Sequence, residues 1–240
     1  MQVKAIKTRI FRENEDLLLF ILKYIKTIRE NSILVITSKI VALSEGRVLD
    51  HKDEKQKIRL IQKESQFSLK DKNNLFAVKD GMIMAFAGID ESNGDGKMIL
   101  LPKNSFFSAE RLRKNLMQKF NLKNLGVLVA DSGFMPLRSG ALGLAVGYAG
   151  FQGVKNYIGA KDIFGRVLKM SKTNVADSLA TSAVLCMGEG NEQRPLAIIT
   201  RAPIVFTEKI KRQELIINSK KDIYAPLFAN LRTIENGKKK

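Results

Sequence analysis

Residues 126–140 read Gly-Val-Leu-Val-Ala-Asp-Ser-Gly-Phe-Met-Pro-Leu-Arg-Ser-Gly, and this stretch decides how the rest of the chain is interpreted. The apolar run at 125–130 has the length and the β-branched content of a buried strand. The run stops at Asp131 and Ser132, and Gly133 follows at once. A strand that ends in a carboxylate beside a glycine presents it at a sheet edge, where ligand sites are common. We therefore take Asp131 as the centre of a candidate site and look for its partners.

Composition places the chain among ordinary globular proteins. It has 240 residues, of which 45% are hydrophobic and 27% charged, and no apolar run approaches the roughly 18 residues of a membrane span. Met1 is followed by a strand-like run without a signal-peptide pattern. The single cysteine excludes a disulfide framework and a cysteine-rich zinc site. These features predict a protein of the reducing cytoplasm.

The formal net charge of +17 calls for an anionic partner. Nucleic acid is one candidate, and a polyphosphate or polycarboxylate substrate is another. Only 7% of the residues are aromatic, and aromatic residues do not alternate with basic ones as they do in single-strand binders. Nucleic acid is therefore the less favoured partner.

Hydrophobic periodicity predicts strands at residues 3–10, 33–37, 75–78, 82–87, 125–130, 141–150 and 196–200. Helices are predicted from an Asn14 N-cap to about residue 30, in the first half of 51–74, from a Ser108 cap to Phe120, at 171–187 before Gly188, and at 223–231. Asp80-Gly81 marks a hairpin turn, and the glycines of 141–150 indicate a closely packed strand. The irregular order favours a mixed α+β fold. We interpret residues 1–236 as one domain, with two subdomains as an option whose boundary the sequence does not locate, and 237–240 as a solvated basic tail.

Several common catalytic motifs are absent from the sequence. It contains no G-x-x-x-x-G-K-[ST] motif, and no G-x-G-x-x-G motif follows a strand. The only histidine, His51, lies in a charged segment, which argues against Ser-His-Asp and Cys-His hydrolases.

Asp90, Asp131 and Glu189 each lie in a glycine-rich loop at the end of a predicted element. Carboxylates beside hydroxyl groups suit hard cations such as Mg²⁺ or Mn²⁺. Asp90 is equally typical of a turn former, and Glu189 of a solvated helix end. Spacing alone does not bring the three acids together, so both interpretations stay open.

Four ordered segments resemble the coenzyme F420 γ-glutamyl ligase family over roughly residues 1–205. They are Ser38-Lys39-Ile40-Val41 with Ser44-Glu45-Gly46-Arg47, Ala87-Gly88-Ile89-Asp90-Glu91-Ser92-Asn93 with Leu100-Leu101-Pro102, Val129-Ala130-Asp131-Ser132, and Lys161-Asp162-Ile163-Phe164-Gly165-Arg166 with Ala176-Asp177 and Met187-Gly188-Glu189-Gly190. Each motif alone is weak, but four in the right order are specific.

The resemblance implies an enzyme that uses GTP and two divalent metal ions, magnesium or manganese, to add L-glutamate to a deazaflavin coenzyme precursor. It implies a mixed α/β fold and a homodimer of intertwined subunits. The implied metal ligands are Asp90, Asp131, Ser132 and Glu189. The implied nucleotide contacts are Ser38, Lys39, Asn93, Met187, Gly188, Glu189, Gly190, Asn191, Glu192 and Gln193. The basic side chains nearest the motifs are Lys39, Arg47, Arg138 and Arg166, and each suits either an anion contact or a structural ion pair.

The chain departs from the family pattern at two places. Leu43 stands where the family usually has lysine, and Gly133-Phe134-Met135 stands where a glycine–arginine pair is common. These changes leave a folate-like or other acceptor open as the substrate. A non-catalytic nucleotide-binding protein and a nucleic-acid-binding protein remain the alternatives of a different class.

Overall fold

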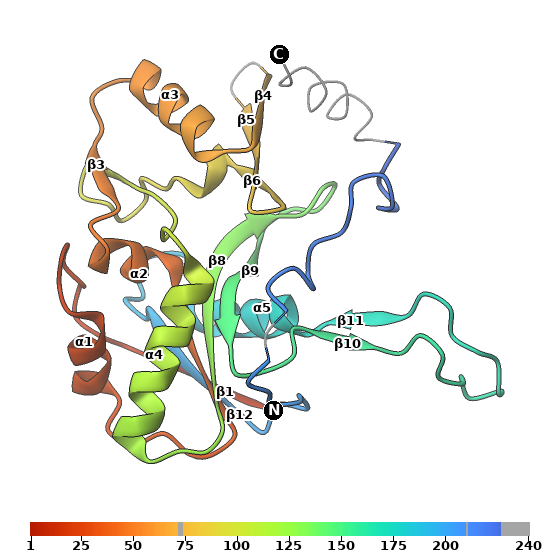
Figure 1. Cartoon of the computed structure of the whole chain (residues 1–240). Helices are drawn as coiled ribbons and strands as arrows, with labels where there is room; N and C mark the ends of the chain where they lie inside the picture. The colour runs from red at the N-terminus through yellow and green to blue at the C-terminus, as the bar shows by residue number, and fades with distance from the viewer. Residues whose placement is uncertain (72–73, 210, 227–240) are drawn as a thin grey trace. The chain divides into compact units, whose positions relative to one another are not determined.

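The computed structural model describes residues 1–71, 74–209 and 211–226 (Figure 1). The chain forms two compact units. The first consists of Met1–Leu49 and Ile99–Arg212, and the second consists of Asp50–Met98 and the segment that begins at Gln213. The sequence had left such a boundary open. The predicted basic tail lies outside the described residues.

The first unit is built on a five-stranded sheet in the order β1-β12-β2-β8-β9. Its strands are β1 (Gln2–Ile6), β2 (Ser32–Thr37), β8 (Leu125–Phe134), β9 (Ala141–Ala149) and β12 (Leu196–Thr200). Only β2 and β8 run parallel, and the other neighbours are antiparallel. Helices α1 (Leu17–Tyr24), α2 (Ser38–Ser44), α4 (Ser105–Phe120) and α5 (Val175–Met187) complete the unit. A mixed sheet with irregularly placed helices confirms the predicted α+β class.

Helices α4 and α5 pack against opposite faces of β9 (Figure 1). The register passes from Val129–Gly147 to Ala130–Ala145, so Val146 is an extra, bulged residue. The bulge turns Gly143 toward α5 and Gly147 toward α4. A Cβ on Gly143 would lie 2.4 Å from the Ala180 carbonyl oxygen, and one on Gly147 would lie 2.4 Å from the Ser105 backbone. The glycines therefore allow close packing, as the sequence predicted.

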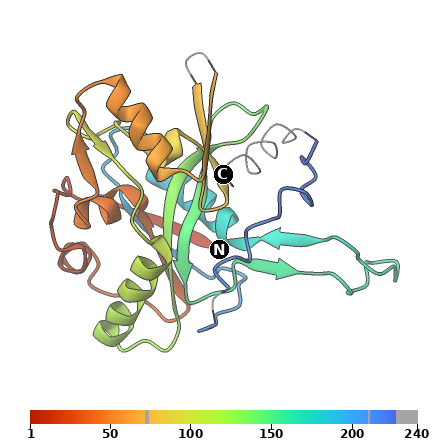
Figure 2. The same cartoon turned by 45° about the horizontal axis from the view of Figure 1, so that its top comes forward.

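A thin antiparallel arm extends from the body of the first unit (Figures 1 and 2). It consists of β10 (Val154–Asn156), β11 (Lys172–Asn174) and the loop between them. Backbone hydrogen bonds from Tyr157 to Ser171 and from Leu168 to Ala160 continue the ladder into this loop. Neither strand is among those predicted from the sequence, because strands of three residues carry too little periodicity to be recognised.

The second unit contains helix α3 (Glu54–Glu64) and a three-stranded antiparallel sheet. The strands are β4 (Phe67–Asp71), β5 (Asn74–Lys79) and β6 (Met82–Ala85), followed by the 3₁₀ turn η1 (Phe86–Gly88). Asp80 and Gly81 both have positive φ in the tight β5–β6 turn, which confirms that hairpin prediction. The short strands β3 (Val48–Asp50) and β7 (Lys97–Ile99) pair where the chain passes between units.

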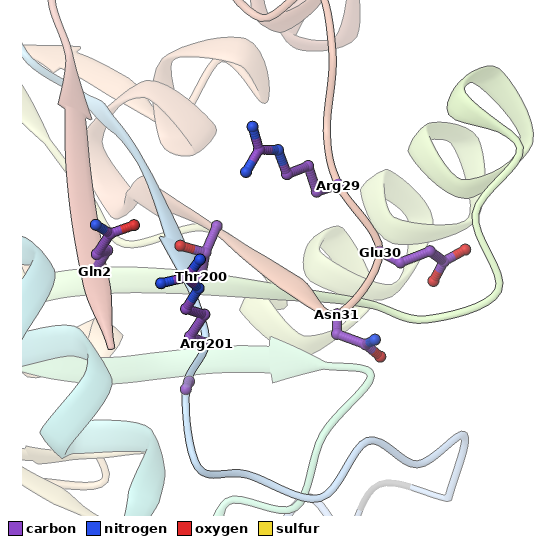
Figure 3. Close-up of a pocket in the computed structure, with 7 residues that line it drawn as sticks. Gln2, Arg29, Glu30, Asn31, Thr200 and Arg201 are labelled. Carbon is purple, nitrogen blue, oxygen red and sulfur yellow. The ribbon is translucent and has the colours of Figure 1, made fainter.

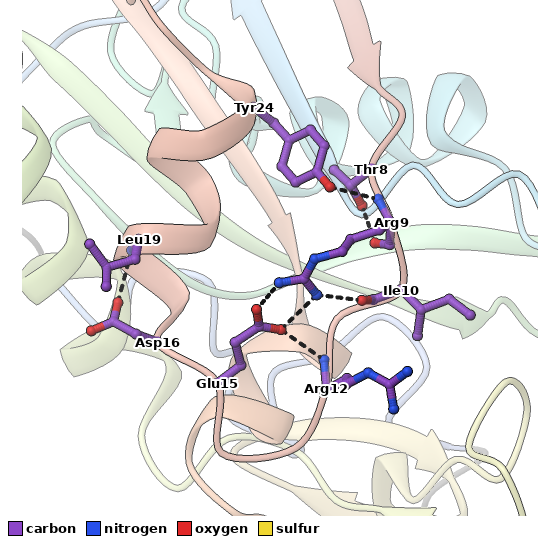
Figure 4. A network of polar contacts seen from close by, with 8 residues as sticks. All are labelled: Thr8, Arg9, Ile10, Arg12, Glu15, Asp16, Leu19 and Tyr24. Carbon is purple, nitrogen blue, oxygen red and sulfur yellow. Dashed lines mark hydrogen bonds and ion pairs between the residues drawn. The ribbon is translucent and has the colours of Figure 1, made fainter.

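The N-terminal predictions were wrong in part. Strand β1 ends at Ile6 rather than at residue 10, because Ile6 pairs with Leu196, the first residue of its partner β12. Beyond it, the Thr8 backbone N–H donates to the Gln193 carbonyl. Figure 4 shows the network that follows, in which Arg9 pairs with Glu15 and Tyr24 accepts from the Arg9 backbone. Asp16, not Asn14, caps α1 by accepting from the Leu19 N–H at 2.8 Å.

The other boundary errors have similar local causes. Helix α1 ends at Tyr24, and the apolar residues after it are buried in extended chain that crosses the sheet. Asn104, not Ser108, caps α4, while the Ser108 hydroxyl donates to Glu45 at 2.6 Å. Residues 223–226 form turns rather than the predicted helix start, and the rest of 223–231 lies outside the described residues. Over the described residues, every helix is too short or too polar to cross a bilayer.

Candidate functional site

The parallel pairing of β2 with β8 brings Ser38 to Asp131. Thr37 lies opposite Ala130 in the register, so the next residues of the two segments are neighbours. The Ser38 hydroxyl donates to Asp131 Oδ1 at 3.0 Å, and Ser38 is only 5% exposed. One face of the Asp131 carboxylate is thereby oriented by a buried donor.

Strand β8 does not end at Asp131, so the opening prediction of a broken strand was wrong. It continues to Phe134, and Asp131 pairs with Leu144 of β9. At Asp131 the backbone stays in the strand conformation, and it is the burial of the side chains that changes. The residues up to Ala130 are buried, whereas Asp131 is half-buried and Ser132 is exposed. The carboxylate thus stands where a buried strand emerges into solvent.

A second hydroxyl–carboxylate pair joins β8 to the end of α5. The Ser132 hydroxyl lies 2.8 Å from both carboxylate oxygens of Glu189. Glu189 follows Gly188, the C-cap of α5 at φ 85°, which confirms the predicted end of that helix. The first unit therefore holds two separate hydrogen-bonded pairs, Ser38–Asp131 and Ser132–Glu189, at successive residues of β8.

The loop after α5 holds its own shape. Glu192 folds back so that its Oε2 accepts from the Gly190 N–H at 2.8 Å, and a Cβ on Gly188 would lie 2.3 Å from the Glu192 carboxyl carbon. The Gln193 carbonyl accepts from Thr8 at 2.9 Å, which joins the loop to the chain after β1. Met187 is buried beneath the loop. The resemblance implies that residues 187–193 contact the nucleotide, which stays a prediction; the Glu192 carboxylate hydrogen-bonds within the loop.

Asp90 and Asn93 belong to the second unit, which is described by itself. The Asp90 carboxylate accepts from the Ser92 N–H at 2.7 Å and from the Ser92 hydroxyl at 2.9 Å. This is the turn-forming role that the sequence allowed for. Phe86 and Ala87 just before it have φ of 52° and 55°. Such conformations are strained for these residues and cluster at functional segments.

An ion-pair cluster fixes the segment that carries Asp90. Lys57 Nζ lies 3.0 Å from Glu91, and His51 Nδ1 lies 3.2 Å from the other oxygen of the same carboxylate. The ammonium of Lys57 also lies 5.0 Å from the centre of the Phe86 ring. Sequence patterns do not predict this cluster, because contacts between residues of distant loops leave no local periodicity.

The basic candidates are placed differently from one another. Lys39 is half-buried beside Ser38 on α2. The Arg47 side chain donates to the Leu101 carbonyl at 3.1 Å, so it has a structural role. Arg138 lies in the exposed β8–β9 turn, and Arg166 lies on the arm. Of the four, Lys39 stands nearest in the chain to the Ser38–Asp131 pair.

The donor set of the first unit suits a hard cation. Asp131, Glu189 and Ser132 offer oxygen ligands only, as Mg²⁺ and Mn²⁺ prefer. In the part of the chain that the structure describes, no three or more His, Cys, Asp or Glu side chains form a ready metal-binding group. The carboxylates instead bond to hydroxyls, which orient their oxygens. Oriented carboxylate oxygens of this kind fit a metal by their chemistry.

Comparisons with known proteins bear directly on this site. The family model described as "F420-0:Gamma-glutamyl ligase" matches residues 5–201. A protein of Methanococcus maripaludis strain C7, named coenzyme F420:L-glutamate ligase, is 33% identical over 93% of this chain and 97% of its own. A protein of the same name from Methanocaldococcus jannaschii is 32% identical over 93% and 96%. The matched region contains every candidate site residue named above, and the chain therefore belongs to the F420-0:γ-glutamyl ligase family.

Proposed function

We propose that this protein is a γ-glutamyl ligase that uses GTP to join L-glutamate to the carboxylate of a deazaflavin coenzyme precursor. The observation that carries the proposal is the family match over residues 5–201, with relatives named coenzyme F420:L-glutamate ligase along nearly their whole length. The paired hydroxyls and carboxylates of the first unit support it. We assign the reaction to the cytoplasm, in keeping with a single free cysteine.

The reaction needs an activated carboxyl group, because a carboxylate is a poor acylating agent. Transfer of the GTP γ-phosphoryl group to a carboxylate oxygen of the acceptor gives an acyl phosphate and GDP. The amine of L-glutamate then attacks the acyl carbon, phosphate leaves, and the amine loses a proton. Phosphoryl transfer depends mostly on positioning and charge neutralisation.

We assign Asp131, Ser132 and Glu189 of the first unit to the binding of divalent magnesium or manganese, which when bound would neutralise charge on the phosphates. Asp90 of the second unit is proposed separately as a metal ligand. Ser38 keeps Asp131 oriented through its 3.0 Å hydrogen bond. In the first unit we assign Lys39 and the loop after α5 to the nucleotide, where glycine permits close approach of a ligand once the Glu192 carboxylate moves off Gly188 and Gly190. In the second unit, Asn93 is a separate proposal for a nucleotide contact.

The tip of the β8–β9 hairpin is our candidate for the acceptor contact. Phe134 lies two residues beyond Ser132 on the same face of β8, because side chains alternate along a strand. Phe134, Met135 and Leu137 are all exposed, and Arg138 follows them. Apolar side chains beside a cation match an acceptor with a planar ring and an acidic group. A folate-like acceptor has the same chemistry, so both belong in the assay.

We also propose that the protein works as a homodimer. The arm exposes Ile158, Ile163, Phe164, Val167 and Met170, and five large apolar residues on one projecting hairpin are typical of an interaction surface. A second copy of the chain is the partner that the family resemblance implies.

The direct test is to incubate the protein with GTP, Mn²⁺, L-glutamate and either acceptor, and to measure the mass increment of one glutamyl residue. Product with the deazaflavin precursor supports the proposal, and product with a folate-like acceptor alone changes the substrate. A thermal shift with GTP and metal but no turnover would favour a non-catalytic binder. Absence of product and of any shift, from folded protein, would rule the function out.

Asp131→Asn tests the site separately. Loss of the charge should remove the metal-dependent thermal stabilisation by GTP, while the fold is kept because the amide oxygen still accepts from Ser38. Asp80→Asn is the matched control, since it removes the same charge from an exposed turn at φ 50°, where asparagine is equally suited. A full GTP shift in Asp131→Asn would show that the site is misassigned.

A further inference from the structure

Two adjoining cavities lie at the end of the first unit's sheet opposite Ser38. Their volumes are about 310 Å³ and 500 Å³, and both are lined by Gln2, Arg29 and Thr200 (Figure 3). Ser32 begins β2, whereas Ser38 follows its last residue, so the two ends are separated by roughly 16 Å of strand. The cavities therefore lie outside the candidate ligase site.

A row of polar residues crosses three neighbouring strands at this end. Gln2 lies opposite Thr200 in the β1–β12 register, and Ser32 occupies the next position beyond the Ile199–Ile33 pair. Residues opposite one another in paired strands point to the same face of a sheet. The adjacent row, Val3, Ile199 and Ile33, is wholly apolar. Because successive side chains alternate between the two faces, the polar row and the apolar row point to opposite sides of the sheet. The polar row therefore lies on one face, and Gln2, Ser32 and Thr200 all line the larger cavity there.

Ser32 has an unused hydrogen-bonding group in this row. It is fully buried, and its Oγ has no hydrogen-bond partner among the described residues. Ser32 also lines the larger cavity. Buried hydroxyls nearly always have a partner, so an orphaned one calls for an explanation. A bound ligand whose oxygen accepts a hydrogen bond from the Ser32 hydroxyl would be the missing partner.

The charge around the cavities is strongly positive. Arg29 and Arg201 line the smaller cavity and Lys4 lines the larger one. Over the described residues, none of these three cations has a carboxylate within ion-pair distance. Figure 3 shows Arg201 extending along Thr200 on the side where Gln2 lies. Cations that share a cavity without a counter-ion repel one another, and a bound anion removes that repulsion.

The one acid at the rim is already engaged. Glu30 accepts from the backbone N–H groups of Lys123 and Asn124 at 2.6 and 2.9 Å. These two hydrogen bonds hold the pKa of the Glu30 carboxyl below its ordinary value. In Figure 3 its carboxylate points away from Arg29. It therefore leaves the charge of the arginines available to a ligand.

We propose that this cavity binds a compact oxyanion, a phosphate or carboxylate group. Arginine guanidinium groups match such groups through paired N–H donors. Lys4 adds a point charge, and the Ser32 hydroxyl supplies a donor from within the protein. The site is independent of the ligase assignment, because none of its residues belongs to the candidate catalytic machinery.

Isothermal titration calorimetry tests the proposal, with inorganic phosphate as the ligand in one experiment and succinate in the other. Chloride keeps the ionic strength constant. EDTA is present and nucleotide is absent, so that neither a metal ion nor GTP contributes to the signal. Saturable binding in either experiment is expected, and the anion that binds identifies the group. Arg29→Gln and Arg201→Asn should each weaken it about tenfold or more, the loss of one charged hydrogen bond. Asparagine replaces Arg201 because this position has a φ of 55°, and asparagine tolerates positive φ better than most residues.

Two controls locate the binding. Arg111→Gln removes the same charge from the exposed face of α4, and Asp131→Asn alters the candidate ligase site. Neither should change the affinity. The proposal is overturned if neither anion saturates, or if either control weakens binding as much as Arg29→Gln does.

Ser32→Ala gives a second, independent readout. Without anion, removal of an unpartnered buried hydroxyl should raise Tm by about 2–4 °C. In saturating anion the gain should disappear, because the wild-type hydroxyl then has its partner. A variant that is less stable than wild type in chloride would show that the hydroxyl already has a partner and would contradict the proposal.

Discussion

Arg113 connects three separate parts of the first unit through one side chain. It is 5% exposed, its Nε donates to the Leu125 carbonyl at 2.6 Å, and its terminal nitrogens pair with both oxygens of Glu208. This pairing holds the pKa of the Glu208 carboxyl below its ordinary value. Because the pKa of Glu208 is lower in the folded protein than in the unfolded chain, its charged form stabilises the fold. The stabilisation is complete at pH values above the pKa of the unfolded chain. It is lost as pH falls through the lower pKa of the folded protein.

Glu208→Gln should therefore lower the free energy of unfolding at pH 7 by about 1 kcal/mol, a value that allows for solvent screening of the mostly exposed carboxylate. The difference from wild type should shrink as pH falls below about 4.5, the ordinary carboxyl pKa. Urea titrations from pH 7 to pH 3 measure it. Glu110→Gln is the control, because its pairs with Lys114 at 3.2 Å and Arg212 at 3.5 Å are both exposed and should each contribute less than about 0.5 kcal/mol. A constant difference at every pH would exclude a titrating contribution from Glu208.

Gly143→Ala should destabilise the fold by about 1–3 kcal/mol, because the added methyl would overlap the α5 backbone. The φ of Gly143 is not in the positive range, so overlap alone is responsible. Gly159→Ala separates the cost of steric overlap from the cost of a positive φ. It has open space at φ 90° and should cost about 1 kcal/mol from conformation alone. Denaturant midpoints compare them, and a Gly143 variant as stable as wild type would contradict the tight packing.

At the scale of elements, long apolar runs were predictable and short irregular ones were not. Strands β2, β9 and β12 and helix α3 appear where periodicity placed them, because burial alone specifies such segments. Helix α5 ends as predicted but begins at Val175 rather than at residue 171, because Lys172–Asn174 pair with β10 as strand β11. Helix α2 was missed, since its residues 38–44 had been assigned to a motif. Strand β8 was cut short because a carboxylate followed by glycine resembles a strand end, while antiparallel pairing with β9 carries it on to Phe134.

The arm is the element on which the dimer proposal depends. Phe164→Lys should shift the protein from dimer to monomer in sedimentation equilibrium, because a charge at the interface must be desolvated. Leu185→Lys is a matched control, since Leu185 on α5 is 83% exposed and Phe164 is 84% exposed. A dimer that persists in Phe164→Lys, or one that is lost equally in Leu185→Lys, would remove the arm from the interface.

The candidate site also could be predicted only in part, because its contacts join residues that are far apart in the sequence. The sequence identified Asp131 and Glu189, but it could not show that Ser38 and Ser132 orient them, because such pairs join residues 93 and 57 positions apart. It did not locate the boundary that places Asp90 in the second unit, and the role of Asp90 as a metal ligand stays a prediction. Contacts between distant segments depend on topology, which local patterns do not encode.

For the whole molecule, the net charge of +17 predicts stability that depends on salt. Self-repulsion should weaken as ions screen it, so Tm should rise between low and physiological ionic strength. Scanning calorimetry at increasing sodium chloride concentration measures this rise in Tm. At equal ionic strength, the anion that binds the cavity at Gln2 and Ser32 should add a further increase that Arg29→Gln abolishes. A Tm that is flat or falls with salt would show that the charges are already balanced by ion pairs.

The strand order has a consequence for synthesis on the ribosome. β1 is the first strand to emerge, yet its sheet partner β12 spans Leu196–Thr200, and β2 must wait for β8. A nascent chain therefore carries the apolar strand Ile33–Ile36 without its sheet neighbours until most of the message has been translated. Fragments that stop before residue 196 should bind chaperones or aggregate, and recombinant expression should favour slow synthesis at low temperature.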